Sequence, residues 1–490
     1  MSGTGIIWFR ADLRLVDNTA LLAAREQCEN LVAVYLPTPM QWHEHHVAPI
    51  QVDLIHRRLA VLKDLLADLN IPLVVREVAD FSDVPLAITQ LAGESGAHSV
   101  FCNKQYENDE QLRDKNVKNA LSPLNIQFHC FDDSCIVNPG DVVTQAGEAF
   151  KVFTPFRKAW LSYLYRAGLQ VQPPPAKVDS NALMTLSDGD IPTFTYPKVN
   201  SIDWPVDEEA IRQRLLTFCE TKVALYHQQR DIPSIDGTSC LSPYLATGCL
   251  SARQCLSVLL NYAPNCLISP DSGGFAWLNE LVWREFYRHL LVAYPKLGRN
   301  QPFVSWTNNV LWRESDEYLQ AWQQGRTGYP IVDAAMRQLK ATGWMHNRLR
   351  MITASFLTKD LLIDWRAGER WFMSHLIDGD FASNNGGWQW AASTGTDAQP
   401  YFRVFNPTTQ GERFDPKGEF IRTWVHELKD VPDKYIHTPH LWPEAARNND
   451  PVLFDSPVCL DYPLPIVDHK AARVCTIEVF RIAKEMADRI

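Results

Sequence analysis

The stretch GIIWFRADLRLVDNTALLAAREQCENLVAVYL, residues 5–36, decides the fold of the first part of the chain. It contains two short apolar runs, Gly5–Phe9 and Leu31–Leu36, separated by a longer segment. Similar runs follow at Leu73–Val78, Ser99–Cys102 and Ile126–Phe131, and Val52–Leu69 carries leucines at helical spacing. Alternating strands and helices of this length predict an α/β N-terminal domain built on a parallel, doubly wound sheet.

A sheet of this kind binds ligands beyond the carboxyl ends of its strands. The dinucleotide signature is absent, because Gly3 and Gly5 come at or before the start of the first strand and no glycine-rich turn follows it. We therefore do not expect an NAD site.

Helical periodicity dominates the second half of the chain. It follows a Pro173-Pro174-Pro175 segment that is typical of a linker. The predicted helices are Glu208–Leu225, Ala252–Tyr262, Gly274–Ala293, Asp316–Gln324, Ile331–Thr342, His346–Leu362 and Glu369–Ser374. We predict an α/β domain over 1–132, an interdomain linker over 133–205 and a mainly α-helical domain over 206–490.

Composition narrows the class of protein. The 490 residues are 46% hydrophobic and carry a formal charge of −10, which excludes a generally basic coat but not a local basic groove. The 11 cysteines include no CxxC pair, which indicates reduced thiols and no zinc or iron–sulfur site. We expect no metal site and no membrane span, and a cytoplasmic protein. Of 16 tryptophans, 12 lie between Trp277 and Trp442.

One predicted helix carries an unusual face. In WLNELVWREFYRHL, the residues Glu280, Trp283, Arg284 and Tyr287 share one side, and WMHNRLRMITASFL places Asn347, Arg350 and Met351 similarly. Such a face is costly to bury unless something polar lies against it. The residues suit either a polar ligand or an internal network of arginines and carboxylates.

Other motifs leave two interpretations open. IDGDFASNNGGWQWAAS, residues 377–393, is expected to be a loop whose glycine pair and tryptophans bind a flat ligand, or else a tight turn between helices. TSCLSPYLATGCLSARQ, residues 238–254, offers hydroxyls and amides ahead of a helix start at Ser251, which suits a phosphate or a capped turn. The run from His43 to His46 is a weak metal candidate, because four adjacent residues cannot converge on one ion.

Taken in order, these segments resemble the photolyase/cryptochrome family, specifically the bacterial class I cyclobutane pyrimidine dimer photolyases of the folate type. The resemblance runs from WFRADLRLVDN at Trp8 to DYPLPIVDHKAAR at Arg473 and includes GYPIVDAAMRQL, TGWMHNRLRMITASFLTKDLLIDWR and DGDFASNNGGWQWAASTGTDAQPYFRVFNP. It implies an α/β domain, a helical FAD domain and light-driven repair of pyrimidine dimers in UV-damaged DNA by electron transfer from reduced FAD to a flipped-out dimer. It implies a monomer that needs no protein partner and associates with the nucleoid when bound to DNA.

The resemblance also implies roles for single residues. FAD would be held by Tyr226, Thr238, Ser239, Leu241, Ser242, Trp277, Arg284, Asn347, Arg350, Asp378, Asp380 and Asn384, with Arg350 and Asp378 paired and Asn384 at the flavin N5. The catalytic residues at the lesion would be Glu280, Trp283, Met351, Asn384 and Trp390. Trp312, Trp365 and Trp388 match the family's electron relay.

DNA contact is expected from Arg230, Glu280, Trp283, Arg348 and Arg403. Residues 337–370 hold seven Lys or Arg against three acids, although solvated helix faces are an equal interpretation for Lys359 and Arg366. A methenyltetrahydrofolate antenna is expected at Arg10, His45, Asp109, Glu110 and Arg299.

The sequence departs from the family pattern at three positions. Asp109 stands where asparagine is usual, Arg299 where lysine is common, and Cys240 where arginine is usual, which removes a charge near the flavin phosphates.

Three alternatives to dimer repair remain. The first is a (6-4) photolyase, which would need a second histidine where Met351 stands. The second is a blue-light cryptochrome without repair activity, which often has Asp or Cys at position 384. The third is a flavoprotein that binds its ligands without catalysing repair.

Overall fold

The computed structural model describes residues 3–179, 181–186, 189–442, 445–447 and 458–489. The chain forms two compact units, each assembled from separate stretches of sequence. The first unit comprises Met1–His227, Ser239–Arg299 and Ile377–Ser383, and the second comprises Gln228–Thr238, Asn300–Leu376 and Asn384–Ile490. The boundaries at residues 132 and 205 stay a prediction. The proposed linker contains helix α6 (Phe153–Ala167), and its positions 180, 187 and 188 lie outside the described residues.

A five-stranded parallel sheet forms the centre of the first unit's N-terminal part. Its strands are β1 (Thr4–Phe9), β2 (Asn30–Tyr35), β3 (Leu73–Val75), β4 (Ala97–Asn103) and β5 (Gln127–Phe131), in the order β3-β2-β1-β4-β5. All five predicted strands and the doubly wound class are confirmed. The order reverses between β1 and β4, so the expected ligand position is at the carboxyl ends of these two strands.

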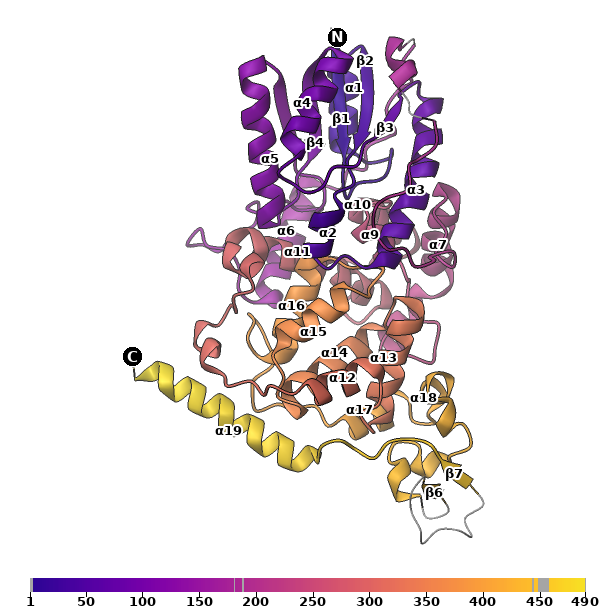
Figure 1. The fold of residues 1–490 in the computed structure, drawn as a ribbon, viewed down its shortest axis with the longest axis vertical. Helices are drawn as coiled ribbons and strands as arrows, with labels where there is room; N and C mark the ends of the chain where they lie inside the picture. The colour runs from indigo at the N-terminus through magenta and orange to yellow at the C-terminus, as the bar shows by residue number, and fades with distance from the viewer. Residues whose placement is uncertain (1–2, 180, 187–188, 443–444, 448–457, 490) are drawn as a thin grey trace. The chain divides into compact units, whose positions relative to one another are not determined.

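Alternation along the strands builds the core of this sheet. Ile6 and Trp8 face the same side as Val100 and Cys102, where they pack with side chains of α4 (Val84–Ser95) and α5 (Asn108–Leu121). Figure 1 shows α4 and α5 together on one side of the sheet and α3 (Pro49–Asp68) on the other. The remaining helices of this part are α1 (Thr19–Gln27) and α2 (Pro39–Glu44).

Helices complete the first unit. They are α6, α7 (Glu208–Thr221), α9 (Ser242–Ala246), α10 (Ala252–Tyr262) and α11 (Gly273–Ala293), while the single turn α8 (Tyr226–Gln229) spans the boundary. Ser251 caps α10, as the sequence predicts. Its hydroxyl accepts a hydrogen bond from the backbone amide of Gln254 at 3.0 Å, and the Gln254 side-chain oxygen accepts one from the backbone amide of Ser251. At Gly273 a Cβ would lie 1.9 Å from the Val223 carbonyl, so the start of α11 needs glycine.

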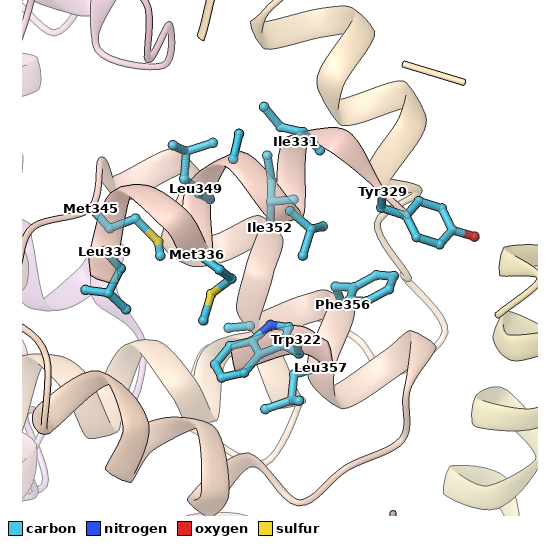
Figure 2. Close-up of a cluster of buried hydrophobic side chains, with 14 of the residues drawn as sticks. Trp322, Tyr329, Ile331, Met336, Leu339, Met345, Leu349, Ile352, Phe356 and Leu357 are labelled. Atoms are coloured by element: carbon cyan, nitrogen blue, oxygen red, sulfur yellow. The ribbon is translucent and has the colours of Figure 1, made fainter. Parts of the chain in front are cut away.

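The second unit is helical. It contains α12 (Asp316–Gln324), α13 (Pro330–Thr342), α14 (Asn347–Ser355), the π-helical turn η6 (Phe356–Asp360), α15 (Trp365–Met373), most of α16 (Phe381–Ala392), α17 (Pro407–Phe414), α18 (Glu419–Trp424) and α19 (His469–Asp488), with a short parallel pair β6 (Ala445–Arg447) and β7 (Val458–Leu460). Figure 2 shows Met336 beside the indole of Trp322, in a core cluster that also contains Leu349 and Ile352. The indole nitrogen donates to the Thr353 carbonyl at 3.1 Å, so burial leaves this donor satisfied.

The prediction of a loop over 377–393 is wrong, because most of this segment is helix α16. Asn384, Asn385 and the glycine pair have low helix propensity, and this misled the sequence interpretation. A local hydrogen bond at its start and the burial of Trp388 stabilise the helix instead. The Asp380 carboxylate accepts from the Ser383 amide at 2.9 Å at its start, and Trp388 is buried on its inner side.

Among the described residues, no helix has both the length and the apolar character needed to cross a lipid bilayer.

Candidate functional site: a flavin and lesion site

Helix α11 presents the mixed face that the sequence predicts. The Trp283 ring stacks on Phe153 of α6 with centroids 3.6 Å apart and planes 4° apart, and it contacts Tyr287 one turn along the helix. The Arg284 guanidinium donates to the carbonyls of Ser134 at 2.8 Å and Leu245 at 3.2 Å. These contacts fix the rotamers on this face, which Glu280 shares, before any ligand arrives.

One partner of a buried ion pair that the sequence does not predict lies on the same helix. Arg288 Nη2 donates to Asp380 Oδ2, and both side chains are almost fully buried. The nearby Arg288 and Arg284 charges lower the pKa of Asp380 to about 2 despite the opposing effect of burial. In contrast, burial together with the Glu110 and Asp380 carboxylates raises the pKa of Glu107 to about 7. Arg288 is one helical turn beyond Arg284, which is the signal that could have found it.

The flavin candidates of the first unit, apart from Arg284 on α11, fall into three groups. Tyr226 and Trp277 both pack against Phe218, at ring distances of 5.8 and 4.9 Å. Ser239, Leu241 and Ser242 lie at the entrance to α9, where Cys240 adopts a left-handed backbone conformation with φ of 49°. Asp378 and Asp380 precede α16.

The remaining flavin candidates belong to the second unit, together with Thr238. Asn347, Arg350 and Met351 lie on α14, and the Arg350 Nε donates to the Met345 carbonyl at 2.8 Å. His346 caps this helix, because its Nδ1 accepts a hydrogen bond from the backbone amide of Arg348. Burial lowers the pKa of His346 to about 4, so the imidazole is neutral at pH 7. The predicted pairing of Arg350 with Asp378 stays a prediction.

Asn384 belongs to a hydrogen-bond network that includes a buried acid. Its Nδ2 donates to the Glu369 carbonyl at 3.0 Å, and the neighbouring Asn385 Nδ2 donates to the Glu369 carboxylate at 2.8 Å. Burial raises the pKa of Glu369 to about 7. These bonds fix the orientation of the Asn384 amide, and Glu369 is a functional candidate that sequence reasoning missed. Trp390 lies further along α16 and contacts Phe405.

The three relay tryptophans lie in the second unit. Trp365 and Trp388 are buried, and Trp312 is partly exposed. Helices α15 and α16 approach closely at Gly368, where a Cβ would lie 2.1 Å from the Trp388 ring. Trp312 packs edge-on against Phe480 of α19, with centroids 5.8 Å apart.

The DNA-binding candidates Arg230 and Arg348 are brought together by Asp231. Arg348 Nη2 lies 2.9 Å from the Asp231 carboxylate and Arg230 Nε 3.9 Å from it, while Arg403 is exposed. Lys359 is neither solvated nor available to DNA: it is 1% exposed, and its ammonium donates to Ser393 Oγ at 2.9 Å. The sequence count of basic residues over 337–370 therefore overstated the free charge.

Four of the five antenna candidates lie at or near the sheet's switch point. Arg10 follows β1, where it pairs with Asp114 at 3.2 Å and lies over the Trp8 ring. His45 Nε2 lies 3.1 Å from Asp109 Oδ2 and its Nδ1 lies 3.6 Å from Glu110 Oε1.

The fifth antenna candidate, Arg299, is the last residue of the 3-10 turn η4 (Pro295–Arg299). This turn meets the start of α5, where Asn108 donates to the Pro295 carbonyl at 2.9 Å. Asp109 keeps a polar contact within this group through His45.

Residues 5–178 match the family described as DNA photolyase, and residues 277–481 match the FAD binding domain of DNA photolyase. The chain belongs to the DNA photolyase family. It is 52% identical over 486 residues to the deoxyribodipyrimidine photo-lyase of Escherichia coli, covering 98% of this chain and 99% of that protein. A class III photolyase from Agrobacterium tumefaciens has a TM-score of 0.84 and 34% identity over 99% of this chain and 98% of its own.

The photolyase fold also extends to a cryptochrome. The Synechocystis cryptochrome has a TM-score of 0.85 at 27% identity, covering 98% of this chain and 99% of its own. Fold alone therefore does not separate photolyases from cryptochromes. The higher identity to the Escherichia coli photo-lyase is what separates the two.

Proposed function

We propose that this chain uses blue light to repair cyclobutane pyrimidine dimers in DNA, as a class I photolyase with reduced FAD. The observation that carries the proposal is 52% identity across 98% of the chain to a deoxyribodipyrimidine photo-lyase. The amide at Asn384 also favours repair over a cryptochrome function, because cryptochromes often carry Asp or Cys there.

Buried polar atoms support a bound flavin. Among the described residues, His346 Nε2 and Trp388 Nε1 are buried without a hydrogen-bond partner, and leaving such atoms unsatisfied costs about 1–3 kcal/mol each. His346 directly precedes Asn347, and Trp388 lies one turn after Asn384 on α16, so a polar, planar ligand that reaches both asparagines would lie near these two atoms. The residues proposed to hold it are Tyr226, Thr238, Ser239, Leu241, Ser242, Trp277, Arg284, Asn347, Arg350, Asp378, Asp380 and Asn384.

The chemistry of the substrate explains why a flavin is needed. A cyclobutane ring offers no acidic proton and no polar bond, so side-chain acids and bases have nothing to attack. When bound and reduced, FAD would supply light-driven electron donation that opens the ring with no net redox change. The protein's residues therefore bind and orient, and none acts as a nucleophile.

Each side chain at the lesion has a positioning role. Glu280 accepts a hydrogen bond from a thymine edge, Trp283 and Trp390 pack against the bases, and Met351 fills the space beneath them. The stacking of Trp283 on Phe153 at 3.6 Å supports this role, because a fixed indole loses no rotamer entropy when a base packs on it. Asn384 offers a neutral amide, which hydrogen-bonds without adding charge.

DNA binding follows from the need to flip the lesion. Extrusion costs a few kcal/mol, least for a damaged and badly stacked pair, and Arg230, Arg348 and Arg403 would bind the flanking phosphates. Salt should weaken this binding. We also propose that the protein acts as a monomer in the cytoplasm and associates with the nucleoid only through DNA.

A folate antenna is proposed at Arg10, His45, Asp109, Glu110 and Arg299. Arg10 Nε and Glu110 Oε2 are buried without a partner among the described residues, so the site offers a free donor and a free acceptor to a pteridine. Photoreduction of FAD is proposed to use Trp388, Trp365 and Trp312.

The test measures dimer loss in an irradiated oligonucleotide by the reduced flavoprotein, with and without blue light. We expect loss only in light and a lower binding affinity and repair rate for Glu280→Ala. The exposed Glu209→Gln on α7 is the matched control and should behave as the wild type. FAD-bound protein that removes no dimers in light would overturn the proposal and favour the cryptochrome function.

A further inference from the structure

Two cysteines far apart in sequence face each other across neighbouring strands. Cys102 on β4 pairs in register with Cys130 on β5, and both lie on the side of the sheet that α5 covers. The two sulfurs and a carboxylate oxygen of Asp114 all lie within 4.8 Å of one another. Cys102 is fully buried, whereas Cys130 is on the edge strand and partly exposed.

The electrostatic environment makes the two thiols different. The Cys102 thiol beside it, together with the positive charges of Arg10 and Lys104, lowers the pKa of Cys130. Burial raises the pKa of Cys102. A thiolate is the nucleophile in sulfur chemistry, so the accessible Cys130 is the attacking sulfur and Cys102 the resolving one.

A metal ion fits this cluster poorly. Asp114 Oδ1 already accepts from Arg10 at 3.2 Å and from Arg113 at 3.0 and 2.7 Å. Both guanidiniums are permanently charged and would repel a cation placed beside them. The same positive charge stabilises a thiolate, so the cluster favours redox chemistry over metal binding.

We propose that Cys130 and Cys102 form a peroxide-sensitive dithiol. Hydrogen peroxide oxidises the Cys130 thiolate to a sulfenic acid and releases hydroxide. The Cys102 thiol then attacks that sulfur, a disulfide forms and water leaves. In sum, two thiols and one peroxide give one disulfide and two waters.

Strand geometry allows the bond. Neighbouring strands lie about 4.7–4.9 Å apart, within the range of about 4.4–6.8 Å between the Cα atoms of disulfides. Rotation about the two Cα–Cβ bonds can bring the sulfurs together without moving the sheet. Oxidation removes a negative charge from beside Arg10 and leaves Asp114 as its counter-ion.

The chain contains its own matched control pair. Cys219 and Cys266 are buried neighbours in the helical part of the first unit, and burial raises their pKa values to about 12 and about 11. The pKa of Cys130 is lowered instead, so its thiolate fraction at pH 7 exceeds that of Cys219 and of Cys266. Cys130 should therefore react with peroxide faster than either.

The experiment treats the full-length flavoprotein with hydrogen peroxide in the dark, blocks the remaining thiols with N-ethylmaleimide and maps the peptides by mass spectrometry. We expect a linked Cys102–Cys130 peptide, its reversal by dithiothreitol and no linked Cys219–Cys266 peptide. In Cys102→Ala, Cys130 should instead be trapped by dimedone as a sulfenic acid. Cys130→Ser should give neither product.

Two results would overturn the inference. One is a native wild-type protein in which Cys130 reacts with peroxide no faster than Cys219. The other is stoichiometric zinc in the purified protein that shields both thiols from N-ethylmaleimide. Because the first measurement uses only the wild-type chain, the inference remains testable if a variant fails to fold, and it is independent of repair activity.

Discussion

Replacing Lys359 with methionine should stabilise the protein. Lys359 lies in the π-helical turn η6, where its ammonium contacts Ser393 Oγ at 2.9 Å and lies 3.8 Å from the ring centroid of Phe480. Burial lowers the pKa of this lysine from 10.5 to about 7. The charged form of Lys359 therefore has a higher free energy in the folded state than in the unfolded chain, where water solvates it.

The pKa difference sets the size and the pH dependence of the effect. At about 1.4 kcal/mol per pKa unit, the charged lysine costs about 4 kcal/mol at pH 7 and about 2 kcal/mol at pH 9. The unfolded state binds more protons between pH 7 and 10.5, so the wild type gains stability from this group as pH rises. Methionine removes the cost but leaves the Ser393 hydroxyl unpaired, which costs about 1 kcal/mol. The net gain is about 3 kcal/mol at pH 7 and about 1 kcal/mol at pH 9.

The assay is urea unfolding of the wild type and Lys359→Met between pH 6 and 9, followed by circular dichroism. The difference between the two proteins at each pH cancels the titration of all other groups. Lys340→Met, at the exposed end of α13, is the control and should shift stability little at any pH. A variant less stable than the wild type at pH 7, or a stability difference that does not change with pH, would refute the reasoning.

Three further substitutions test the relay and the buried ion pair. Trp312→Phe should slow photoreduction of oxidised FAD and spare repair by pre-reduced protein, and equal loss of both rates would contradict the relay. Gly368→Ala should displace the Trp388 ring, because the new Cβ would lie 2.1 Å from it. The free energy of unfolding should fall by about 1–3 kcal/mol. An unchanged Tm would argue against that close contact. Arg288→Met should cost about 3–5 kcal/mol at pH 7 by removing the ion-pair partner of the buried Asp380 carboxylate. Because the pKa of Asp380 is about 2 against an ordinary 3.8, the stability that it gains from this pairing is present above pH 4 and is lost as pH falls towards 2. Urea unfolding should therefore show a smaller difference at pH 3.

Local sequence signals predicted most of the regular elements. Short apolar runs located all five strands, and the hydroxyls and amides before Ser251 located the start of α10, because a helix cap acts within one helical turn. The α11 face with Glu280, Trp283 and Arg284 was visible in the sequence because helical spacing is itself a local property.

Long-range contacts decided what the sequence could not show. Helix α16 was predicted as a loop because its asparagines and glycines are poor helix formers, whereas the packed fold keeps them helical. The Arg288–Asp380 pair joins positions 92 residues apart, and the pairing of Cys102 with Cys130 depends on the strand order. Lys359 looked like a surface cation because charge counts carry no information on burial.

The central claim is that an electron is lent to the dimer and returned. The most direct test counts dimers split per reduced FAD under blue light, without added reductant and without oxygen, while the flavin absorbance is recorded. The account predicts many dimers split per flavin with the reduced flavin unchanged at the end. Loss of one reduced flavin for each dimer split, or no dimer splitting in light, would contradict it.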